Sequence, residues 1–417
     1  MSKEKLIPEL RFPEFIGKDE WKLDNVNSLF DLQDGYPFSS KVFTSNPKNG
    51  RQVIRITDIN NQNKNSEKVY IPEDKIDDLG ISAYSVENGD LLLSLTGAAG
   101  FNFYIWGNGA AFINQRTMKI TPRDSKNEFL KVILSPLIHE KINGIGTGQN
   151  NNLSKDALKA IQFPVPQPQE QQKIASCLSS LDELIAAHND KLDALKDHKK
   201  GLLQNLFPQE GETVPKLRFP EFEGDGEWDT KTLDELGELV NGLTYSPKDV
   251  RNEGLLVLRS SNIQNGIIDF NDCVYVRSDI KGANLSRPKD ILICVRNGSK
   301  RLIGKNAIIP ENIPLATHGA FMTVFRASNP DFVFQLFQSD AYDRQVKADL
   351  GATINSINGK NFIKYEFAVP SNPQEQQKIA SCLSAVDELI TAQQEKIDEL
   401  QQHKKGLMQG LFPKIND

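Results

Sequence analysis

Basic side chains gather in one part of this 417-residue chain. Between Arg277 and Lys305 there are eight Lys or Arg residues against two acidic ones, a local balance of +6. Lys and Arg neutralise phosphates, and in a major groove Arg or Lys can bond guanine while Asn can bond adenine. The stretch therefore predicts a phosphate-facing patch, although a solvated basic loop would have the same composition. The candidate contacts in this half are Arg259, Arg296, Asn297, Lys300, Arg301 and Lys305.

The first half of the chain has no comparable patch, because residues 51–160 hold 13 basic and 12 acidic side chains. Its candidates lie in polar loops that follow apolar runs. One such loop, Gly146–Ser154, can read adenine edges through Gln149 and its asparagines, or can be a polar turn capped by Ser154. The equivalent residues 351–358 keep the glycine and asparagines but not the glutamine. The candidate contacts in this half are Arg55, Thr96, Asn114, Gln115, Arg116, Gln149, Asn150 and Asn151.

The overall composition is that of a soluble globular protein of two or three domains, with 38% hydrophobic and 25% charged residues. Lys and Arg number 49 against 55 Asp and Glu, and this net charge of −6 argues against an obligate polyanion binder. Four cysteines without a C-x-x-C pair fit a reducing cytoplasm. Residues 91–115 carry no charge, but their glycines and asparagines favour a buried strand over 91–95 and a loop rather than a membrane span.

The sequence contains an internal tandem repeat. Pro8–Phe15 recurs as Pro215–Phe222 at an offset of 207 residues, and Pro168–Pro208 recurs as Pro373–Pro413 with 29 identities in 41 positions. The chain is therefore a tandem duplication of roughly 206 residues. The predicted organisation is a first domain over 1–166, a central helix over 167–208, a second domain over 209–371 and a distal helix over 372–417.

The two domains differ in sequence but share a skeleton of short Val, Ile and Leu runs broken by Gly, Asn and Pro. These runs predict mixed α/β domains of about 150 residues, each with one further helix, over 128–142 in the first and 331–350 in the second. The matching runs are Val53–Ile59 with Val257–Ile263, Gly89–Ser94 with Lys289–Cys294, and Phe163–Pro166 with Phe367–Pro370.

The shared segments have the 4-3 spacing of a coiled-coil seam, sustained over more than four heptads. Prolines near both ends fix helices of about 36 residues, on the order of 54 Å long. The first seam is Ile174, Leu178, Leu181, Ile185, His188, Leu192, Leu195, Lys199, Leu202 and Leu206. The second is Ile379, Leu383, Val386, Ile390, Gln393, Ile397, Leu400, Lys404, Leu407 and Leu411.

The two helices are each other's obvious partners. Connectivity does not decide their orientation, but a duplication suggests a two-fold axis, and a two-fold axis perpendicular to the helices makes them antiparallel. His188 and Gln393 would then face each other, either to set the register or as a locally wet seam. Lys199 and Lys404 are interpreted as solvated seam ends or as partner or DNA-backbone contacts. The repeated aromatic residues either pack the helices onto the domains or, if exposed, anchor an interface: Phe12, Phe15, Trp21, Phe219, Phe222 and Trp228.

Four motifs, each present twice, resemble the specificity (S) subunit of a type I restriction-modification system over essentially the whole chain. They are Leu10-Arg-Phe-Pro-Glu-Phe15, Pro168-Gln-Glu-Gln-Gln-Lys-Ile-Ala175, Asp182-Glu-Leu-Ile185 and His198-Lys-Lys-Gly-Leu202. The resemblance implies an α+β protein with pseudo-two-fold symmetry, in which two target recognition domains are joined by an antiparallel coiled coil. Each domain would read one half of a bipartite, asymmetric DNA target, while the helices would set the spacer and dock the methyltransferase subunits.

The resemblance also implies a non-catalytic, cytoplasmic bacterial or archaeal protein. Its expected partners are double-stranded DNA, two modification subunits and two restriction subunits, with S-adenosylmethionine, ATP and Mg²⁺ on those subunits and no membrane. The sequence agrees, because it has neither an Asn-Pro-Pro-Tyr/Phe methylation motif nor a phosphate-binding loop. Its five scattered histidines suggest no zinc site, and Glu73-Asp74-Lys75 is better interpreted as a solvated turn than as nuclease chemistry. The alternatives are a self-sufficient DNA methyltransferase and a two-headed protein-binding scaffold.

Overall fold

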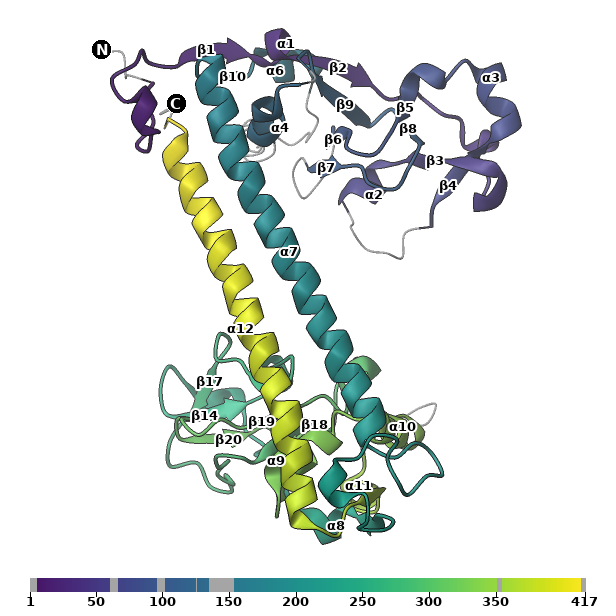
Figure 1. Ribbon diagram of the computed structural model, residues 1–417, viewed down its shortest axis with the longest axis vertical. Coiled ribbons are helices and arrows are strands. Elements are labelled where there is room, and N and C mark those ends of the chain that lie inside the picture. Colours follow the sequence, from purple (N-terminus) through teal and green to yellow (C-terminus); the bar gives the residue numbers. More distant parts are fainter. Residues whose placement is uncertain are drawn as a thin grey trace. The chain divides into compact units, whose positions relative to one another are not determined.

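The computed structural model describes residues 6–60, 67–95, 102–124, 126–134, 154–350 and 355–413. Its contacts divide the chain into a first unit, residues 1–187 and 398–417, and a second unit, residues 188–397. Two 39-residue helices, α7 (Pro168–Leu206) and α12 (Pro373–Leu411), contribute a part of their length to each unit (Figure 1). Each unit thus contains one domain and portions of both long helices.

The described residues of the first domain form two four-stranded sheets. The antiparallel sheet has the order β2-β9-β6-β7, and the mixed sheet has the order β4-β3-β8-β5 with β3 parallel to β8. Their strands are β2 (Phe30–Asp34), β3 (Gly50–Ile54), β4 (Val69–Pro72), β5 (Ser85–Val86), β6 (Leu91–Ser94), β7 (Phe103–Ile105), β8 (Ala111–Ile113) and β9 (Thr117–Pro122). The helices are α1 (Val26–Leu29), α2 (Ile56–Asn60), α3 (Ile76–Leu79), α4 (Glu128–Leu134) and α6 (Lys155–Ala160).

The second domain repeats this plan. Its antiparallel sheet has the order β12-β21-β18-β19, and its mixed sheet has the order β13-β17-β14-β20 with β14 parallel to β20. The strands are β12 (Gly237–Asn241), β13 (Val250–Arg251), β14 (Leu255–Leu258), β17 (Val274–Val276), β18 (Ile291–Cys294), β19 (Asn306–Ile308), β20 (Ala316–His318) and β21 (Met322–Ala327), besides the hairpin of β15 (Ile263–Gln264) and β16 (Ile267–Ile268). The helices are α8 (Leu233–Leu236), α9 (Pro330–Leu336), α10 (Asp340–Asp349) and α11 (Gly359–Phe362).

The predicted strand over 91–95 is confirmed as β6, whose last three residues are buried. The single helix predicted over 331–350 is wrong, because the chain forms α9 and α10 with a break between them. Ser339 causes the break: its hydroxyl donates to the Leu336 carbonyl at 2.7 Å and caps α10 by accepting from the Tyr342 amide. In the first domain α4 begins at Glu128 as predicted, and residues 135–142 of that prediction lie outside the described part of the chain.

A buried ion pair holds each repeated Leu-Arg-Phe-Pro motif to the start of a long helix. The Arg11 guanidinium donates to both Glu170 carboxylate oxygens at 2.7 and 2.8 Å, and in the second unit Arg218 binds Glu375 in the same way at 2.8 Å. Each glutamate lies in the first turn of its helix, where negative charge is favourable. The hydrogen bonds to the glutamate, together with its negative charge, raise the pKa of both arginines.

The repeated aromatic residues pack the helices onto the domains. Trp21 and Trp228 are buried, and Trp21 makes edge contacts with Phe129 and Phe412. Phe222 is buried as well, while Phe12, Phe15 and Phe219 are half-buried. The interpretation of these residues as packing groups is therefore confirmed, and strands β1 (Lys22–Asn25) and β11 (Asp229–Thr232) continue from them to pair with β10 (Gln162–Val165) and β22 (Glu366–Val369).

The seam of the coiled coil follows the predicted spacing, since every predicted position is buried or half-buried. In the first unit Ile174 and Leu178 share a cluster with Leu407 and Leu411. In the second unit the partners are Leu202 and Leu206 with Ile379 and Leu383. The start of one helix thus lies beside the end of the other in each unit, so the helices are antiparallel as expected (Figure 1).

Polar residues pair across the seam. In the second unit the Gln393 amide nitrogen lies 2.7 Å from His188 Nδ1 and 2.8 Å from the His188 carbonyl oxygen, which confirms that these residues face each other. Lys199 donates to Asp387 at 2.6 Å, and in the first unit Lys404 donates to Asp182. Each lysine thus pairs with a carboxylate of the other helix. The Lys404 pair is exposed, as expected of a solvated seam end, whereas Lys199 is only 15% exposed.

Candidate nucleic-acid interface

In each domain one of the connections from the mixed sheet to the antiparallel sheet is a tight turn. We call this the crossover turn: residues 114–116 between β8 and β9, and residues 319–321 between β20 and β21. In the first domain the turn carries Asn, Gln and Arg, and in the second Gly, Ala and Phe. Gln115, Arg116, Ala320 and Phe321 are exposed.

The same backbone hydrogen bonds hold both crossover turns, although their side chains differ. The Asn114 amide donates to the Ile54 carbonyl at 3.1 Å and the Gly319 amide donates to the Leu258 carbonyl at 3.0 Å. The carbonyl of the last turn residue accepts from Leu95 in the first domain and from Val295 in the second, both at 3.0 Å. The ends of β3 and β6, or of β14 and β18, therefore meet at the turn.

A glycine from the end of a neighbouring strand makes this close approach possible. A Cβ on Gly35 would lie 2.1 Å from the Asn114 carbonyl oxygen, and one on Gly242 would lie 2.2 Å from the Gly319 carbonyl oxygen. Both distances are far below van der Waals contact, so only glycine fits. The two glycines recur at the offset of the duplication, and this recurrence is the sequence pattern that could have identified them.

The first domain brings four predicted contacts together at its turn. Arg55 directly follows β3; its backbone amide donates to Asp58 at 2.8 Å and its guanidinium to the Glu67 carbonyl. Asn114 uses its side-chain oxygen to accept from the Gln115 amide at 2.7 Å. Gln115 and Arg116 are exposed, and their side chains make no hydrogen bond to any described residue. The remaining predicted contacts of this domain lie outside the described residues: Thr96, Gln149, Asn150 and Asn151.

The second domain uses several of its predicted contacts internally. Arg259 follows β14 and pairs with Asp272 at 2.7 Å, and the Lys305 ammonium donates to the Ile263 carbonyl. The Asn297 amide donates to the Ser260 hydroxyl at 3.2 Å, which ties the loop after β18 to the loop after β14. Lys300 and Arg301 are exposed in a short 3-10 helix, Lys300–Leu302.

Arg296 contacts both the crossover turn and residues 355–358 of the second domain. Its backbone amide donates to the Phe321 carbonyl at 3.1 Å, and its guanidinium carbon lies 5.7 Å from the centre of the Phe321 ring. Arg296 also forms an antiparallel bridge with Ser356, and Asn355 donates to the Gly298 carbonyl at 3.3 Å. Ser356 belongs to the stretch that is equivalent to the predicted Gln149 loop, so the described residues of that stretch, 355–358, lie beside the turn in the second domain. Phe321 was not predicted, because nothing in its sequence neighbourhood marks it.

The predicted basic patch is smaller than its local balance of +6 suggests. Arg277 pairs with Asp249 at 3.1 Å and Lys289 pairs with Asp331 at 2.7 Å, and both carboxylates come from outside the stretch. Three of the eight basic side chains, Lys281, Arg287 and Arg301, are exposed and have no partner among the described residues. Counting neighbours along the sequence misses carboxylates that the fold supplies.

The described residues contain no group of His, Cys, Asp or Glu side chains that could hold a metal ion. Glu73–Lys75 forms a short exposed 3-10 helix in which Glu73 pairs with Arg51 at 3.3 Å. None of the helices in the described part of the chain combines the length and the apolar character of a membrane span.

The chain thus has two repeated α/β domains with differing, exposed side chains on equivalent turns, and two long antiparallel helices. A sequence profile of the type I restriction modification DNA specificity domain matches this chain twice, over residues 18–197 and 225–402. The chain therefore belongs to the family of type I restriction-modification specificity subunits, which serve DNA recognition.

Named relatives agree with this assignment. The chain is 23% identical over 337 residues to the MjaVIII specificity subunit of Methanocaldococcus jannaschii, covering 78% of each protein. It is 27% identical over 195 residues to the StySPI specificity subunit of Salmonella potsdam, covering 44% of this chain but only 42% of that relative. The fold matches the S subunit of M. genitalium with a TM-score of 0.59 and 16% identity, over 99% of this chain and 100% of that one.

Proposed function

We propose that each domain reads one half of a bipartite, asymmetric DNA target and that the chain itself catalyses no reaction. The observation that carries this proposal is the crossover turn, which has the same backbone frame in both domains and presents different side chains to solvent. A fixed frame with varied side chains suits two readers of different short sequences. Reading by hydrogen bonds to base edges requires such exposed, positioned donors.

The long helices set the spacer in this proposal. Each helix runs without interruption for 39 residues, about 58 Å at the usual rise per residue. Buried seam residues, the His188–Gln393 contact and the two Lys–Asp pairs fix the register between the helices. A fixed register gives the two half-sites one allowed separation on the duplex.

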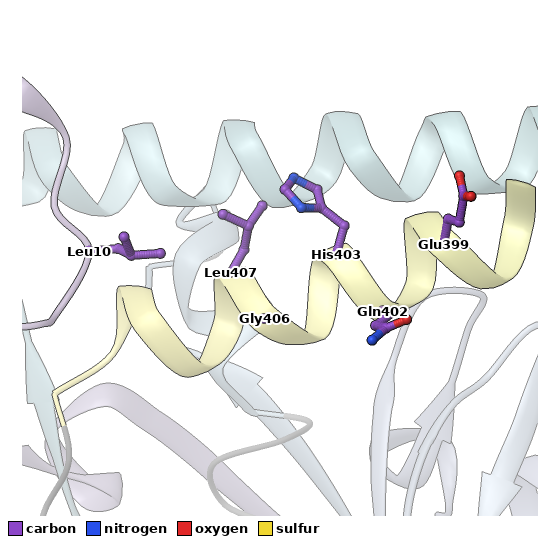
Figure 2. Close-up of a pocket in the computed structure, with 6 residues that line it drawn as sticks. All are labelled: Leu10, Glu399, Gln402, His403, Gly406 and Leu407. Atoms are coloured by element: carbon purple, nitrogen blue, oxygen red, sulfur yellow. The ribbon is translucent and has the colours of Figure 1, made fainter.

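The repeated helix ends are proposed to dock two modification subunits. In the first unit a shallow groove of about 470 Å³ lies between the N-terminal segment and the end of α12 (Figure 2). Leu10 and Leu407 border it, and Gly406 leaves its floor open. The other lining residues are Glu399, Gln402 and His403.

The duplication supplies most of this groove a second time. Leu217, His198, Gly201 and Leu202 stand at the equivalent positions of the second unit, and Gly201 also has open space at its Cβ position. A repeated apolar surface suits two copies of one partner rather than two different partners. The exposed pair Leu184 and Leu389, also related by the duplication, extends the repeated surface along the helices.

We infer that the chemistry belongs to the partner subunits. S-adenosylmethionine would bind the two modification subunits, and ATP and Mg²⁺ would bind the two restriction subunits. This chain would supply sequence recognition and the spacing between the half-sites.

A methylation assay tests the division of labour. The isolated chain should transfer no methyl groups to DNA, whereas the chain with its modification subunits should methylate a defined duplex sequence in a salt-dependent way. Turnover by the isolated chain would instead show a self-sufficient methyltransferase. If the assembled complex shows no sequence-specific duplex binding, the chain is a protein-binding scaffold.

A further inference from the structure

We propose that Arg296 reads a guanine of the half-site recognised by the second domain, and that Phe321 is the positioning residue that holds its guanidinium. The inference rests on the proposed function and goes beyond it by naming the residues that determine one base of the target. It starts from the contact between the Arg296 guanidinium and the Phe321 ring at 5.7 Å.

Backbone hydrogen bonds hold the residues around this contact in place. Val295 and Arg296 both donate to the Phe321 carbonyl, at 3.0 and 3.1 Å. The Ile357 amide donates to the Val295 carbonyl at 2.8 Å, beside the bridge between Arg296 and Ser356. The backbone of Arg296 is therefore fixed before any ligand arrives, so little backbone entropy remains to be lost on binding.

The charge of Arg296 is not used by the protein. Arg259, Arg277 and Lys289 each pair with a carboxylate, whereas Arg296 is exposed and has no acidic partner within the described residues. A guanidinium that rests on an aromatic face keeps the N–H groups of its edge available. Those groups match the O6 and N7 acceptors of guanine in the major groove.

The exposure of Phe321 is not explained by packing within the domain. Its side chain is 58% exposed although the residues on either side of it in the turn and strand are small or buried. Single exposed apolar residues are common on protein surfaces, so exposure alone means nothing. Exposure combined with the stacked, unpaired Arg296 indicates a surface that is completed by a ligand.

The first domain has different residues at the two equivalent sequence positions. Arg116 stands where the second domain has Phe321, and Thr96, which lies outside the described residues, stands where it has Arg296. The arginine of the first domain therefore belongs to the turn itself. Because the crossover turns share their backbone hydrogen bonds but carry different exposed side chains, we expect the two half-sites to contain different bases.

Variants of the pair should change base preference at one position only. The complex of this chain with its modification subunits is assembled on DNA libraries randomised across the target, and the methylated products are sequenced. Arg296→Met keeps the length of the side chain but removes every N–H donor, so we expect discrimination at one G·C pair of the second half-site to fall by roughly 5- to 150-fold. The base preference within the first half-site should stay unchanged.

Phe321 variants separate positioning from simple packing. Phe321→Tyr keeps an aromatic face and should retain the preference, whereas Phe321→Leu keeps apolar bulk without that face and should lose it. Leu315→Ala is the matched control, since Leu315 is 63% exposed at the opposite end of β20 and should change nothing.

Two results would overturn the assignment: an unchanged base preference in Arg296→Met, or an equal loss in the Phe321→Tyr and Phe321→Leu variants. Failure of the proposed function is recognised by a separate result. The unsubstituted complex would then select no bipartite sequence, and the role of Arg296 and Phe321 would fail with it.

Discussion

Gly242 is the residue on which the second crossover turn depends most directly. Its Cβ position lies 2.2 Å from the Gly319 carbonyl oxygen, so Gly242→Ala must displace the turn and with it Phe321. We expect at least a tenfold loss of affinity for the second half-site, since a displaced reader forfeits about 1–3 kcal/mol for each base contact. Binding to DNA with single substitutions in either half-site measures the effect. Gly224→Ala, at an open position, should bind normally.

His318 makes the second domain sensitive to acid. It is buried beside Ser286, and its Nε2 lies 2.9 Å from the Val240 carbonyl oxygen, so the neutral ring donates from Nε2 and accepts from Ser286 at Nδ1. Burial lowers the pKa of His318 below its usual 6.5. The folded state therefore binds fewer protons than the unfolded state, and stability falls as the pH drops below about 6.5.

Hydrogen exchange measures this effect. Amides of β14 and β20 should lose protection between about pH 7.5 and pH 5.5, after correction for intrinsic rates. Amides of β3 and β8 are the internal reference, because Ile113 stands at the equivalent position of the first domain. A His318→Gln variant that kept the same pH dependence would contradict the assignment to this side chain.

At the scale of elements, the buried Arg218–Glu375 pair should matter far more than an exposed one nearby. Arg218 is 8% exposed and Glu375 is 1% exposed, so Arg218→Met leaves a buried carboxylate without its cationic partner, with the Trp228 indole at 3.2 Å as its remaining donor. We expect a loss of about 3–5 kcal/mol in the stability of the contact between the motif and α12. Lys378→Met removes the exposed pair with Glu221 and should cost less than about 1 kcal/mol. Exchange protection over residues 218–232 compares the two, and equal losses would contradict this explanation.

The groove at the end of α12 gives a prediction about assembly. Gly406→Leu places a side chain in open space, so the helix should keep its stability, or gain up to about 1 kcal/mol from its higher helix propensity. The variant should nevertheless bind one modification subunit fewer, because the side chain fills the groove. Native mass spectrometry of the assembled complex measures the number of bound subunits. Gly406→Ala is the control for helix propensity, and full occupancy in Gly406→Leu would rule out docking there.

The elements that follow a regular spacing could be predicted from the sequence, and the contacts that join distant residues could not. Heptad spacing predicted the buried seam and the meeting of His188 with Gln393. Arg11 and Glu170 were each recognised within a motif, but 159 residues separate them and only the fold shows that they pair. Phe321 could not be identified without its contact with Arg296, and Asp249 and Asp331 neutralise part of the basic patch. In both cases the partner residue is distant in the sequence, so the sequence around each residue does not reveal the contact.

At the scale of the whole molecule, the net charge of −6 predicts weak DNA binding by the isolated chain. Much of the phosphate neutralisation would then come from the partner subunits. The slope of log affinity against log salt concentration should be shallow for the isolated chain and steeper for the assembled complex. Equal slopes would show that this chain supplies the electrostatic contacts alone.

If each domain reads its own half-site, the DNA target should have two defined halves and a spacer of fixed length. Sequencing the methylated bases in cells that express this chain with its modification subunits tests this most directly. We predict one asymmetric bipartite motif in which the Gly242→Ala variant relaxes one half only. A continuous motif, or relaxation of both halves by that single substitution, would contradict recognition by two independent domains.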